Sequence, residues 1–361
     1  MHCYRLTAIA AAAVVVLAVL LSACGQPDTN LHPDKSAVAF APLQHPFAGA
    51  ALYVDGTTQA ARWQASHHKS GWLDPITKQP QAHWLNNPED VAGVPALARQ
   101  ADRQHSLLVL VAYFIPNRDC DLAHYTGATA SGFDQAKPEP RSYATFINGL
   151  VAALGTTQAV IVMEPDAVAA HECWSAERAT VLREAIKRLA AAKQFVYLDA
   201  GHPDWLGTGD MAQRLIDAGI NEAEGFALNT SAREPNVGPA DNPAKGLYGY
   251  GEELSSLLGG RQYVIDTSRN GAPVTSGDWC NSPGQGLGAR PGTLRSPAGA
   301  PNLAANLWVK EPGASDGNYN KPNPVDFFLG CHGETLPPGV FSPDQARALI
   351  AHASPPVLAA S

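Results

Sequence analysis

Charged residues are scarce in this 361-residue chain, since Asp, Glu, Lys and Arg together make up only 16% of it. The 25 basic residues are outnumbered by 33 acidic ones and form no cluster. The positive patches that bind phosphates are therefore missing, and we expect no nucleic acid partner. No Cys-x-x-Cys pair occurs among the 6 cysteines, which argues against a zinc site. Apolar residues (45%), 32 glycines and 29 prolines instead indicate a globular, loop-rich protein.

One long apolar run stands at the start of the chain. Residues 1–23 contain an arginine, an uncharged apolar stretch and then small residues before Cys24. This pattern is typical of a secretory signal peptide, and the stretch is short for a simple membrane-spanning anchor, which is the alternative. The spelling Leu-Ser-Ala-Cys resembles the bacterial lipobox, in which cleavage leaves a diacylated cysteine. We predict a signal over 1–23, a lipid on Cys24, a tether over 24–44, and an exported lipoprotein anchored to the cell membrane outside the cytoplasm.

The remaining cysteines fit an oxidising compartment. Four are left once the signal peptide is removed and Cys24 is acylated: Cys120, Cys173, Cys280 and Cys331. An even number of cysteines in an exported protein suggests two disulfides.

Seven short apolar runs are each followed by a polar or charged residue. They are Leu52–Val54, Leu107–Tyr113, Ala159–Met163, Phe195–Leu198, Gly225–Leu228, Tyr263–Ile265 and Asn306–Val309. Between them lie patterns of helical period, the clearest over Glu177–Ala191, and a last helix is expected after Ser342, with Gln345 completing a capping box. This alternation predicts a parallel α/β barrel, whose functional groups lie at the carboxyl ends of the strands. Asp119, Asp166 and Asp199 stand at or just beyond such ends.

Aromatic residues accompany these carboxylates. Tyr53, Trp205 and Trp279 lie close to predicted strand ends, where flat rings can stack on the apolar faces of sugars. For Trp308, which lies inside an apolar run, ordinary core packing is the favoured interpretation. Long loops rich in Gly, Pro, Asn and Ser, over Thr126–Pro140, Ala232–Lys245 and Asn270–Ala304, are expected at the same end. Two carboxyl groups flanking a bond between sugars are what its hydrolysis requires.

The local sequences match one family in six ordered blocks. The segment Tyr113–Cys120 resembles the Tyr-x-x-Pro-x-Arg-Asp-Cys signature of glycoside hydrolase family 6, the cellobiohydrolases and endoglucanases acting on β-1,4-glucan. The later blocks are Met163–Asp166, Tyr197–His202 with Trp205, Ile265–Gly271, Asp278–Asn281, and Trp308–Lys310 with Ser315–Gly317. The resemblance runs from about His45 to about Ala353. It implies a distorted barrel of about seven parallel strands, in one catalytic domain over 45–361.

The resemblance also implies the catalytic roles. Asp166 matches the general acid, and Asp119 matches the neighbour whose charge keeps that acid protonated and steadies the transition state. Asp316 matches the carboxylate usually proposed as the base of an inverting reaction, and Tyr113 matches the tyrosine that distorts the sugar ring. Acid–base chemistry of this kind needs no metal or organic cofactor, and we expect a monomer that binds a β-glucan polysaccharide or oligosaccharide.

Substrate-binding positions follow from the same match. Tyr53, Trp205 and Trp279 correspond to surfaces that stack on sugars; His202, Asn229 and Lys310 correspond to hydroxyl-binding positions. Asp199 and Arg269 correspond to polar positions of the cleft, although Arg269 could instead pair with a nearby Asp as scaffold. The implied disulfides are Cys120–Cys173 and Cys280–Cys331.

Three departures leave the substrate open. Ala314 stands where the family usually has Glu, and Glu311 is expected to point elsewhere. The loop Asp121–Phe133 is longer than usual, so that either Thr126 or Ser131 could position the water, and residues 230–233 lack the usual asparagine and aromatic. The resemblance implies inversion, and the segment from Asp316 to Cys331 is short, with no long extra segment to roof the cleft. We predict inverting hydrolysis of internal β-1,4 bonds in an open cleft. The alternatives are a lipoprotein that binds glycan without turnover and a hydrolase of another envelope β-glycan.

Overall fold

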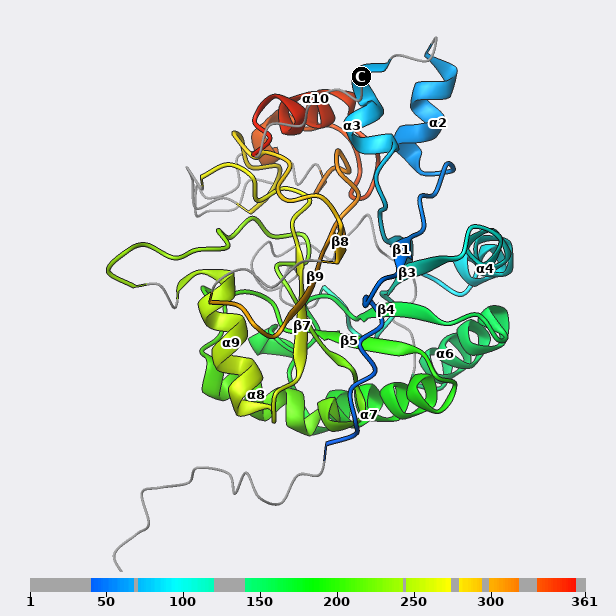
Figure 1. Cartoon of the computed structure of the whole chain (residues 1–361), viewed down its shortest axis with the longest axis vertical. Helices are drawn as coiled ribbons and strands as arrows, with labels where there is room; N and C mark the ends of the chain where they lie inside the picture. Colours follow the sequence, from blue (N-terminus) through cyan, green and yellow to red (C-terminus); the bar gives the residue numbers. More distant parts are fainter. Residues whose placement is uncertain are drawn as a thin grey trace, which may run out of the picture. The chain divides into compact units, whose positions relative to one another are not determined.

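A curled sheet of parallel strands organises the fold (Figure 1). The computed structural model describes residues 40–67, 71–119, 140–242, 245–273, 279–293, 299–317 and 330–354. Its strands are β1 (Ala51–Leu52), β2 (His83–Leu85), β3 (Ser106–Ala112), β4 (Ala159–Met163), β5 (Phe195–Asp199), β6 (Gly225–Leu228), β7 (Gln262–Asp266), β8 (Gly292–Thr293) and β9 (Leu303–Leu307). They lie in the order β1-β3-β4-β5-β6-β7-β9-β8, and β2 also pairs with β3. All these pairs are parallel except β8 with β9, which is antiparallel.

The sheet curls into a distorted barrel. Strands β1 and β2 pair with the two ends of β3, at Ser106–Leu107 and Leu110–Ala112 respectively, so they share one edge position. Next to β2, the Ala82 N–H donates to the Trp308 carbonyl (2.9 Å), and the Trp84 indole donates to the Val309 carbonyl (2.7 Å). These bonds connect β2 to the segment that follows β9. With β1 and β2 counted as one, seven parallel strands form a curled, incompletely closed barrel. This confirms the predicted fold class.

Most of the predicted strands agree closely with the observed ones. Two predicted runs, Ala159–Met163 and Gly225–Leu228, coincide with β4 and β6. The run Asn306–Val309 is misplaced, because β9 begins three residues earlier, at Leu303, and ends at Leu307. Strands β2 and β8 have only 3 and 2 residues and show no apolar run of their own, so the sequence pattern missed them.

Helices cover the outer face of the barrel (Figure 1). They are α4 (Val94–Arg103), α6 (Pro140–Leu154), α7 (Ala176–Ala191), α8 (Thr208–Asp217) and α9 (Leu247–Leu257), while α2 (Gln59–Ser66), α3 (Asp74–Thr77) and α10 (Pro343–Ala351) pack together elsewhere. The predicted helix over Glu177–Ala191 is confirmed as α7, whose first turn is capped by the Ser175 hydroxyl. The Ser342 cap of α10 is also confirmed, but the Gln345 side chain donates to Asn281 and Glu334 instead of closing the capping box.

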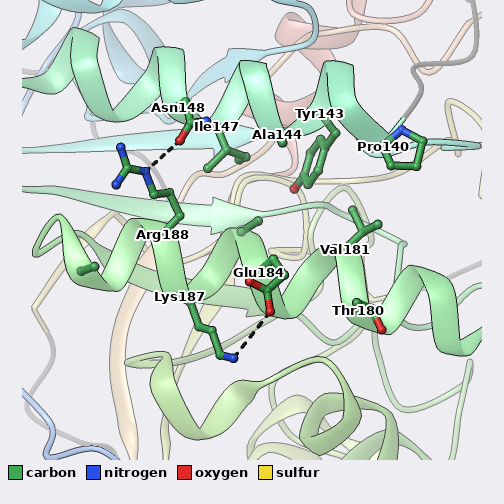
Figure 2. A pocket seen from close by; sticks show the side chains of 12 residues that line it. Pro140, Tyr143, Ala144, Ile147, Asn148, Thr180, Val181, Glu184, Lys187 and Arg188 are labelled. Carbon is green, nitrogen blue, oxygen red and sulfur yellow. Dashed lines mark hydrogen bonds and ion pairs between the residues drawn. The ribbon is translucent and has the colours of Figure 1, made fainter.

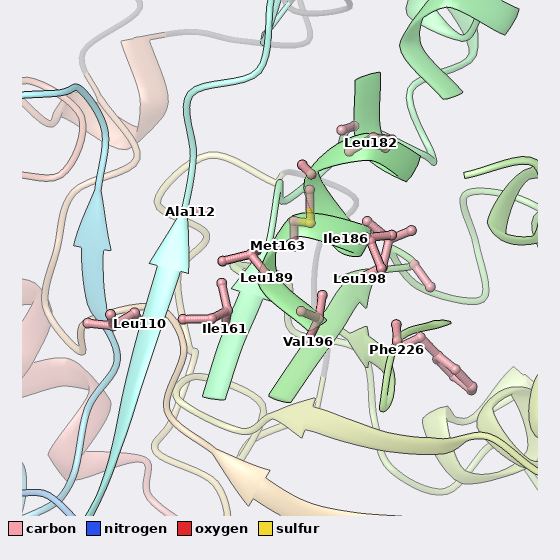
Figure 3. Close-up of a cluster of buried hydrophobic side chains, with 14 of the residues drawn as sticks. Leu110, Ala112, Ile161, Met163, Leu182, Ile186, Leu189, Val196, Leu198 and Phe226 are labelled. Carbon is pink, nitrogen blue, oxygen red and sulfur yellow. The ribbon is translucent and has the colours of Figure 1, made fainter. Parts of the chain in front are cut away.

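Two apolar layers follow from the alternation of side chains along the strands. Alternate residues of β3 to β6, with the stripe Leu182, Ile186 and Leu189 of α7, form the layer between sheet and helices (Figure 3). The other residues, including Val109, Val162 and Tyr197, fill the barrel interior. Because both faces of the strands are buried, polar groups are confined to the strand ends, and the loops there carry the site.

The predicted signal peptide, the lipidation site Cys24 and residues up to 39 of the tether lie outside the described residues. Within the described ranges, no helix combines the length and the apolar character needed to cross a bilayer.

Candidate active site

Two acidic residues lie near Tyr113, beyond the carboxyl ends of β3 and β4. Asp119 lies in the loop after β3, and Asp166 lies in the loop after β4. The strands β3 and β4 are neighbours in the sheet. The Tyr113 hydroxyl, just beyond β3, donates a hydrogen bond to the Asp119 carboxylate. Burial raises the pKa of Tyr113 well above its usual value, and the charges of Asp119 and Asp166 raise it further. Both carboxylates therefore act on one phenol, and the three predicted catalytic groups share one place.

Arg118 contacts both Tyr113 and Asp119. One of its terminal nitrogens donates to the carbonyls of Tyr113 and Asn86. Its Nε lies 3.9 Å from the Asp119 carboxylate, and its guanidinium lies 5.1 Å from the centre of the Tyr113 ring. Arg118 thus holds the backbone of the loop while placing a positive charge beside Asp119.

A buried glutamate, which the sequence analysis did not single out, connects the two loops. Glu164 follows β4 directly and has no exposed surface. Its carboxylate accepts from the backbone N–H groups of Phe114 (3.0 Å) and Ile115 (2.9 Å), just beyond β3. Burial raises the pKa of Glu164 to about 7 against these hydrogen bonds. Its place two residues before Asp166, at a strand end, is the sequence signal that could have identified it.

Asp199 supports Asp166 instead of facing the cleft. Its Oδ2 accepts from the backbone N–H groups of Asp166 (3.0 Å) and Gly201 (3.1 Å). The residue has no exposed surface, and burial raises its pKa to about 6. The prediction that Asp199 contacts substrate is corrected, because its carboxylate is closed off from solvent and holds the backbone of the loop that carries Asp166.

Asp316 is held by two cations. The Nη1 of Arg269 lies 2.7 and 3.0 Å from its two oxygens, and the Lys310 ammonium lies 2.6 Å from Oδ1. Although burial opposes ionisation, Arg269 and Lys310 lower the pKa of Asp316 to about 2. Arg269 therefore pairs with a nearby Asp, as the alternative interpretation expected, and it also lines a cavity. The residue predicted as the base is thus a buried carboxylate paired with two cations.

Asp266, at the end of β7, ties three segments together. Its two oxygens accept from the backbone N–H groups of Ser231, Ser268, Val309 and Lys310, at 2.9 to 3.1 Å. Asn229 joins the same network, since its side chain donates to the Asp266 carbonyl and accepts from the Glu234 N–H. Asn229 has no exposed surface, so the prediction that it binds a sugar hydroxyl is corrected to a structural role.

The aromatic predictions divide between surface and core. Trp279 is 38% exposed, as a surface that stacks on sugar requires, and Trp205 is half-buried beside His202 with ring centres 5.4 Å apart. Burial lowers the pKa of His202 to about 4, so its ring is neutral near pH 7. Trp308 is 1% exposed, which confirms core packing.

Tyr53 is not in the cleft. It is 4% exposed, packs in the layer between sheet and helices, and its hydroxyl donates to Gln100 of α4 (2.7 Å). A ring enclosed in this way offers no face to a sugar, so the predicted stacking role of Tyr53 is corrected. The ring that packs edge-on against Tyr113 is Trp84 of β2, at 5.4 Å, which the sequence analysis did not identify.

One disulfide borders the site. Cys280 and Cys331 are bonded as the resemblance implied, and the adjacent Asn281 N–H donates to the Asp316 carboxylate (2.9 Å). Cys173 is also disulfide-bonded, while its expected partner Cys120 lies outside the described residues. The same holds for Thr126 and Ser131, which were the candidates to position water.

A cavity of about 400 Å³ opens beside Asp316, and its lining includes Arg269, Lys310 and Ala314. Glu311 also lines this cavity, but its carboxylate is hydrogen-bonded to the Gln59 side chain. Glu311 therefore does not take the place of the glutamate that the family usually has at position 314. A second cavity, of about 540 Å³, lies between α6 and α7 on the outer face and contains none of the predicted site residues (Figure 2). In the described part of the chain, no group of three or more His, Cys, Asp or Glu could hold a metal ion.

Comparison with known proteins is consistent across sequence and structure. Residues 45–353 match the family described as glycosyl hydrolases family 6. Endoglucanase A of Cellulomonas fimi is 37% identical over 277 residues, covering 74% of this chain and 57% of that protein. Endoglucanase 1 of Streptomyces halstedii is 34% identical over 284 residues, covering 74% and 81%.

A solved structure extends the likeness to three dimensions. It is that of the endoglucanase Cel6 from Mycobacterium tuberculosis, in complex with methyl-cellobiosyl-4-deoxy-4-thio-β-D-cellobioside. The TM-score is 0.71 at 32% identity, and the match covers 86% of this chain and 99% of that one.

Proposed function

The chain belongs to glycosyl hydrolase family 6, and from this premise we propose that it hydrolyses internal β-1,4-glucosidic bonds of cellulose or a related β-glucan with inversion. The observation that supports this most directly is the meeting of Asp119, Asp166 and Tyr113 at the ends of β3 and β4. Hydrolysis by inversion needs a proton donor on one side of the bond and space for a water on the other. The similarity to endoglucanases favours cleavage of internal bonds of the polysaccharide.

In the proposed reaction Asp166 gives its proton to the glycosidic oxygen as the bond from that oxygen to the sugar carbon breaks. Positive charge develops on the ring, and the Asp119 carboxylate stabilises it. Water adds to the same carbon from the opposite face and loses its proton to neighbouring water. The Tyr113 hydroxyl holds Asp119 in place for this step.

Asp316 has a different role in this scheme. A carboxylate with a pKa of about 2 is a poor proton acceptor near neutral pH, because efficient bases have a pKa close to the working pH. We assign Asp316 to holding Arg269 and Lys310, which line the cavity beside it and can meet sugar hydroxyls there.

The test is hydrolysis of a panel of soluble β-glycans, including carboxymethylcellulose and mixed-linkage β-glucan, with the anomer of the first product read by NMR. We expect new reducing ends, α-configured first products and a rapid fall in viscosity. Asp166→Ala should lower the rate at least about 100-fold, since general acid catalysis contributes about 10² to 10⁴. Asp210→Ala, on the exposed start of α8, is the matched control. Inactivity of the wild type on the whole panel would overturn the proposal.

Ala314 supports a second candidate function, a protein that binds glycan without turnover. Its backbone pairs with Phe341 and its methyl group brings no carboxylate to the cavity beside Asp316. This candidate predicts that calorimetry with cello-oligosaccharides detects binding while the sugar is recovered intact. Activity on an envelope β-glycan alone would point to the third candidate, a hydrolase with that substrate.

We also propose that the protein is a monomeric lipoprotein attached to the membrane through Cys24. The proposal is supported by the signal-like residues 1–23 and the lipobox-like spelling before Cys24. Expression in a bacterial host with labelled fatty acid should mark the wild type and not Cys24→Ser, and the wild type should sediment with membranes. A labelled Cys24→Ser protein, or an unlabelled wild type, would contradict it.

A further inference from the structure

The two loops that hold the catalytic carboxylates have a strained backbone. Four of their residues adopt a positive φ without being glycine: Asn117 (56°), Asp119 (56°), Glu164 (50°) and Asp166 (72°). Such a conformation is unfavourable for a residue with a Cβ atom, and it persists only where surrounding contacts enforce it. The contacts that enforce it here are therefore part of how the site is built.

One side chain bonds to both loops from behind. Arg178 lies in the first turn of α7 and is 7% exposed. Its Nη2 donates to the carbonyls of Pro116 (3.1 Å) and Asn117 (2.8 Å), in the loop after β3. Its Nη1 donates to the carbonyl of Ala167 (3.3 Å), in the loop after β4. A single rigid guanidinium thus spans the two loops.

These contacts lie very close to the reacting groups. Ala167 follows Asp166 directly, and Asn117 precedes Asp119 by two residues. The neighbouring Arg214 of α8 offers a contrast, because it donates only to the loop after β4, at the carbonyls of Val168 and Ala169. Of these two arginines, Arg178 alone contacts both loops.

We propose that Arg178 is a positioning residue that sets the separation of Asp119 and Asp166. The inference rests on the proposed hydrolase function, because the separation matters only if both groups act on one bond. An inverting site works at a defined distance between its carboxyl groups, and an error of about 1 Å in placement can cost about 100-fold in rate. The planar fork of arginine serves two loops at once, which the single ammonium of lysine does not.

The experiment compares Arg178→Lys with wild type on two substrates. Lysine keeps the charge, so any effect reports the lost geometry. Hydrolysis of β-glucan needs the proton of Asp166, whereas 2,4-dinitrophenyl β-cellobioside has a leaving group that departs unprotonated. We expect kcat on glucan to fall about 10- to 100-fold with KM changed less than about threefold. On the aryl glycoside the fall should be at least about tenfold smaller.

The ratio of the two activities separates positioning from folding, since a smaller folded fraction lowers both equally. Arg188→Lys on the exposed face of the same helix is the control, and its ratio should equal that of wild type. An unchanged ratio in Arg178→Lys overturns the proposal.

If that variant gives no soluble protein, Arg178→Ala assayed with and without guanidinium ion replaces it. Selective rescue of glucan hydrolysis supports positioning, and its absence overturns the proposal. A wild type inactive on both substrates instead refutes the proposed function.

Discussion

The Nη1 atom of Arg269 bridges the two oxygens of Asp316, at 2.7 and 3.0 Å, inside the protein. Lys310 completes the cluster at 2.6 Å. Two cations around one carboxylate favour its ionised form and lower its pKa to about 2.

Asp316→Asn tests this relationship. The change leaves two buried cations without their counter-charge, and removing one partner of a buried pair costs about 3–5 kcal/mol. We expect unfolding by urea at pH 7 to report a loss of that order. Because the pKa is lowered to about 2, the stabilisation by Asp316 is complete above about pH 4 and is lost only as the pH falls towards 2. The difference between wild type and variant should therefore shrink only below pH 4. A difference that shrinks between pH 5 and 7 would contradict the assignment.

Tyr113→Phe removes the hydroxyl that donates to Asp119. A hydrogen bond to a charged group contributes about 1.5–3 kcal/mol, so we expect kcat on β-glucan to fall about 10- to 100-fold with a smaller change in KM. Tyr197→Phe is the matched control, because its buried hydroxyl has no hydrogen-bond partner among the described residues. That variant should keep full activity and equal or greater stability. Equal losses of activity in the two variants would show that Tyr113 acts only through packing.

Glu164→Gln probes the buried link between the loops. The pKa of Glu164 is raised to about 7, so the folded protein holds this proton more tightly than the unfolded chain does. The contribution of Glu164 to the free energy of unfolding of the wild type should therefore fall as the pH rises from about 4.5 to 7. Gln resembles the neutral acid, so we expect the variant to be destabilised more at pH 5 than at pH 8, measured by thermal unfolding. A destabilisation that grows with pH would refute this.

Replacement of both Cys280 and Cys331 by Ser removes the cross-link over a sequence separation of 51 residues. Closing a loop of this length stabilises the folded state by about 4 kcal/mol in the chain-entropy account. We expect the melting temperature to fall, and glucan hydrolysis to fall beyond the loss of folded protein, because Asn281 beside Cys280 donates to Asp316. Wild-type protein treated with reductant should lose at least as much stability as the double variant, because reduction also opens the disulfide of Cys173. Unchanged activity of the folded double variant would separate the cross-link from the site.

The position of Asp166 illustrates what could be predicted from sequence. Each βα unit is encoded locally, as an apolar run followed by a turn, so the strand ends that hold Asp119 and Asp166 could be located by pattern alone. Parallel strands place all these ends at one edge, which is why the site followed from the fold class.

Tyr53, Asn229 and Asp199 illustrate what could not be predicted. Each stands near a strand end, but a shift of one position reverses the face of a strand, and a side chain after the last strand residue can turn inwards or outwards. The Tyr53 side chain points towards α4 and donates to Gln100, while the side chains of Asn229 and Asp199 form hydrogen bonds with backbone groups inside the protein.

By itself, the sequence determined the alternation of strands and helices, the place of the carboxylates, and the family. Only the tertiary structure decided which polar groups face the cleft and which bind the loops together. The clearest cases are Glu164, which bonds to a segment 50 residues away, and Arg178, which spans 61 residues to Asn117. Such contacts depend on the register of strands and the packing of α7, which no local pattern encodes.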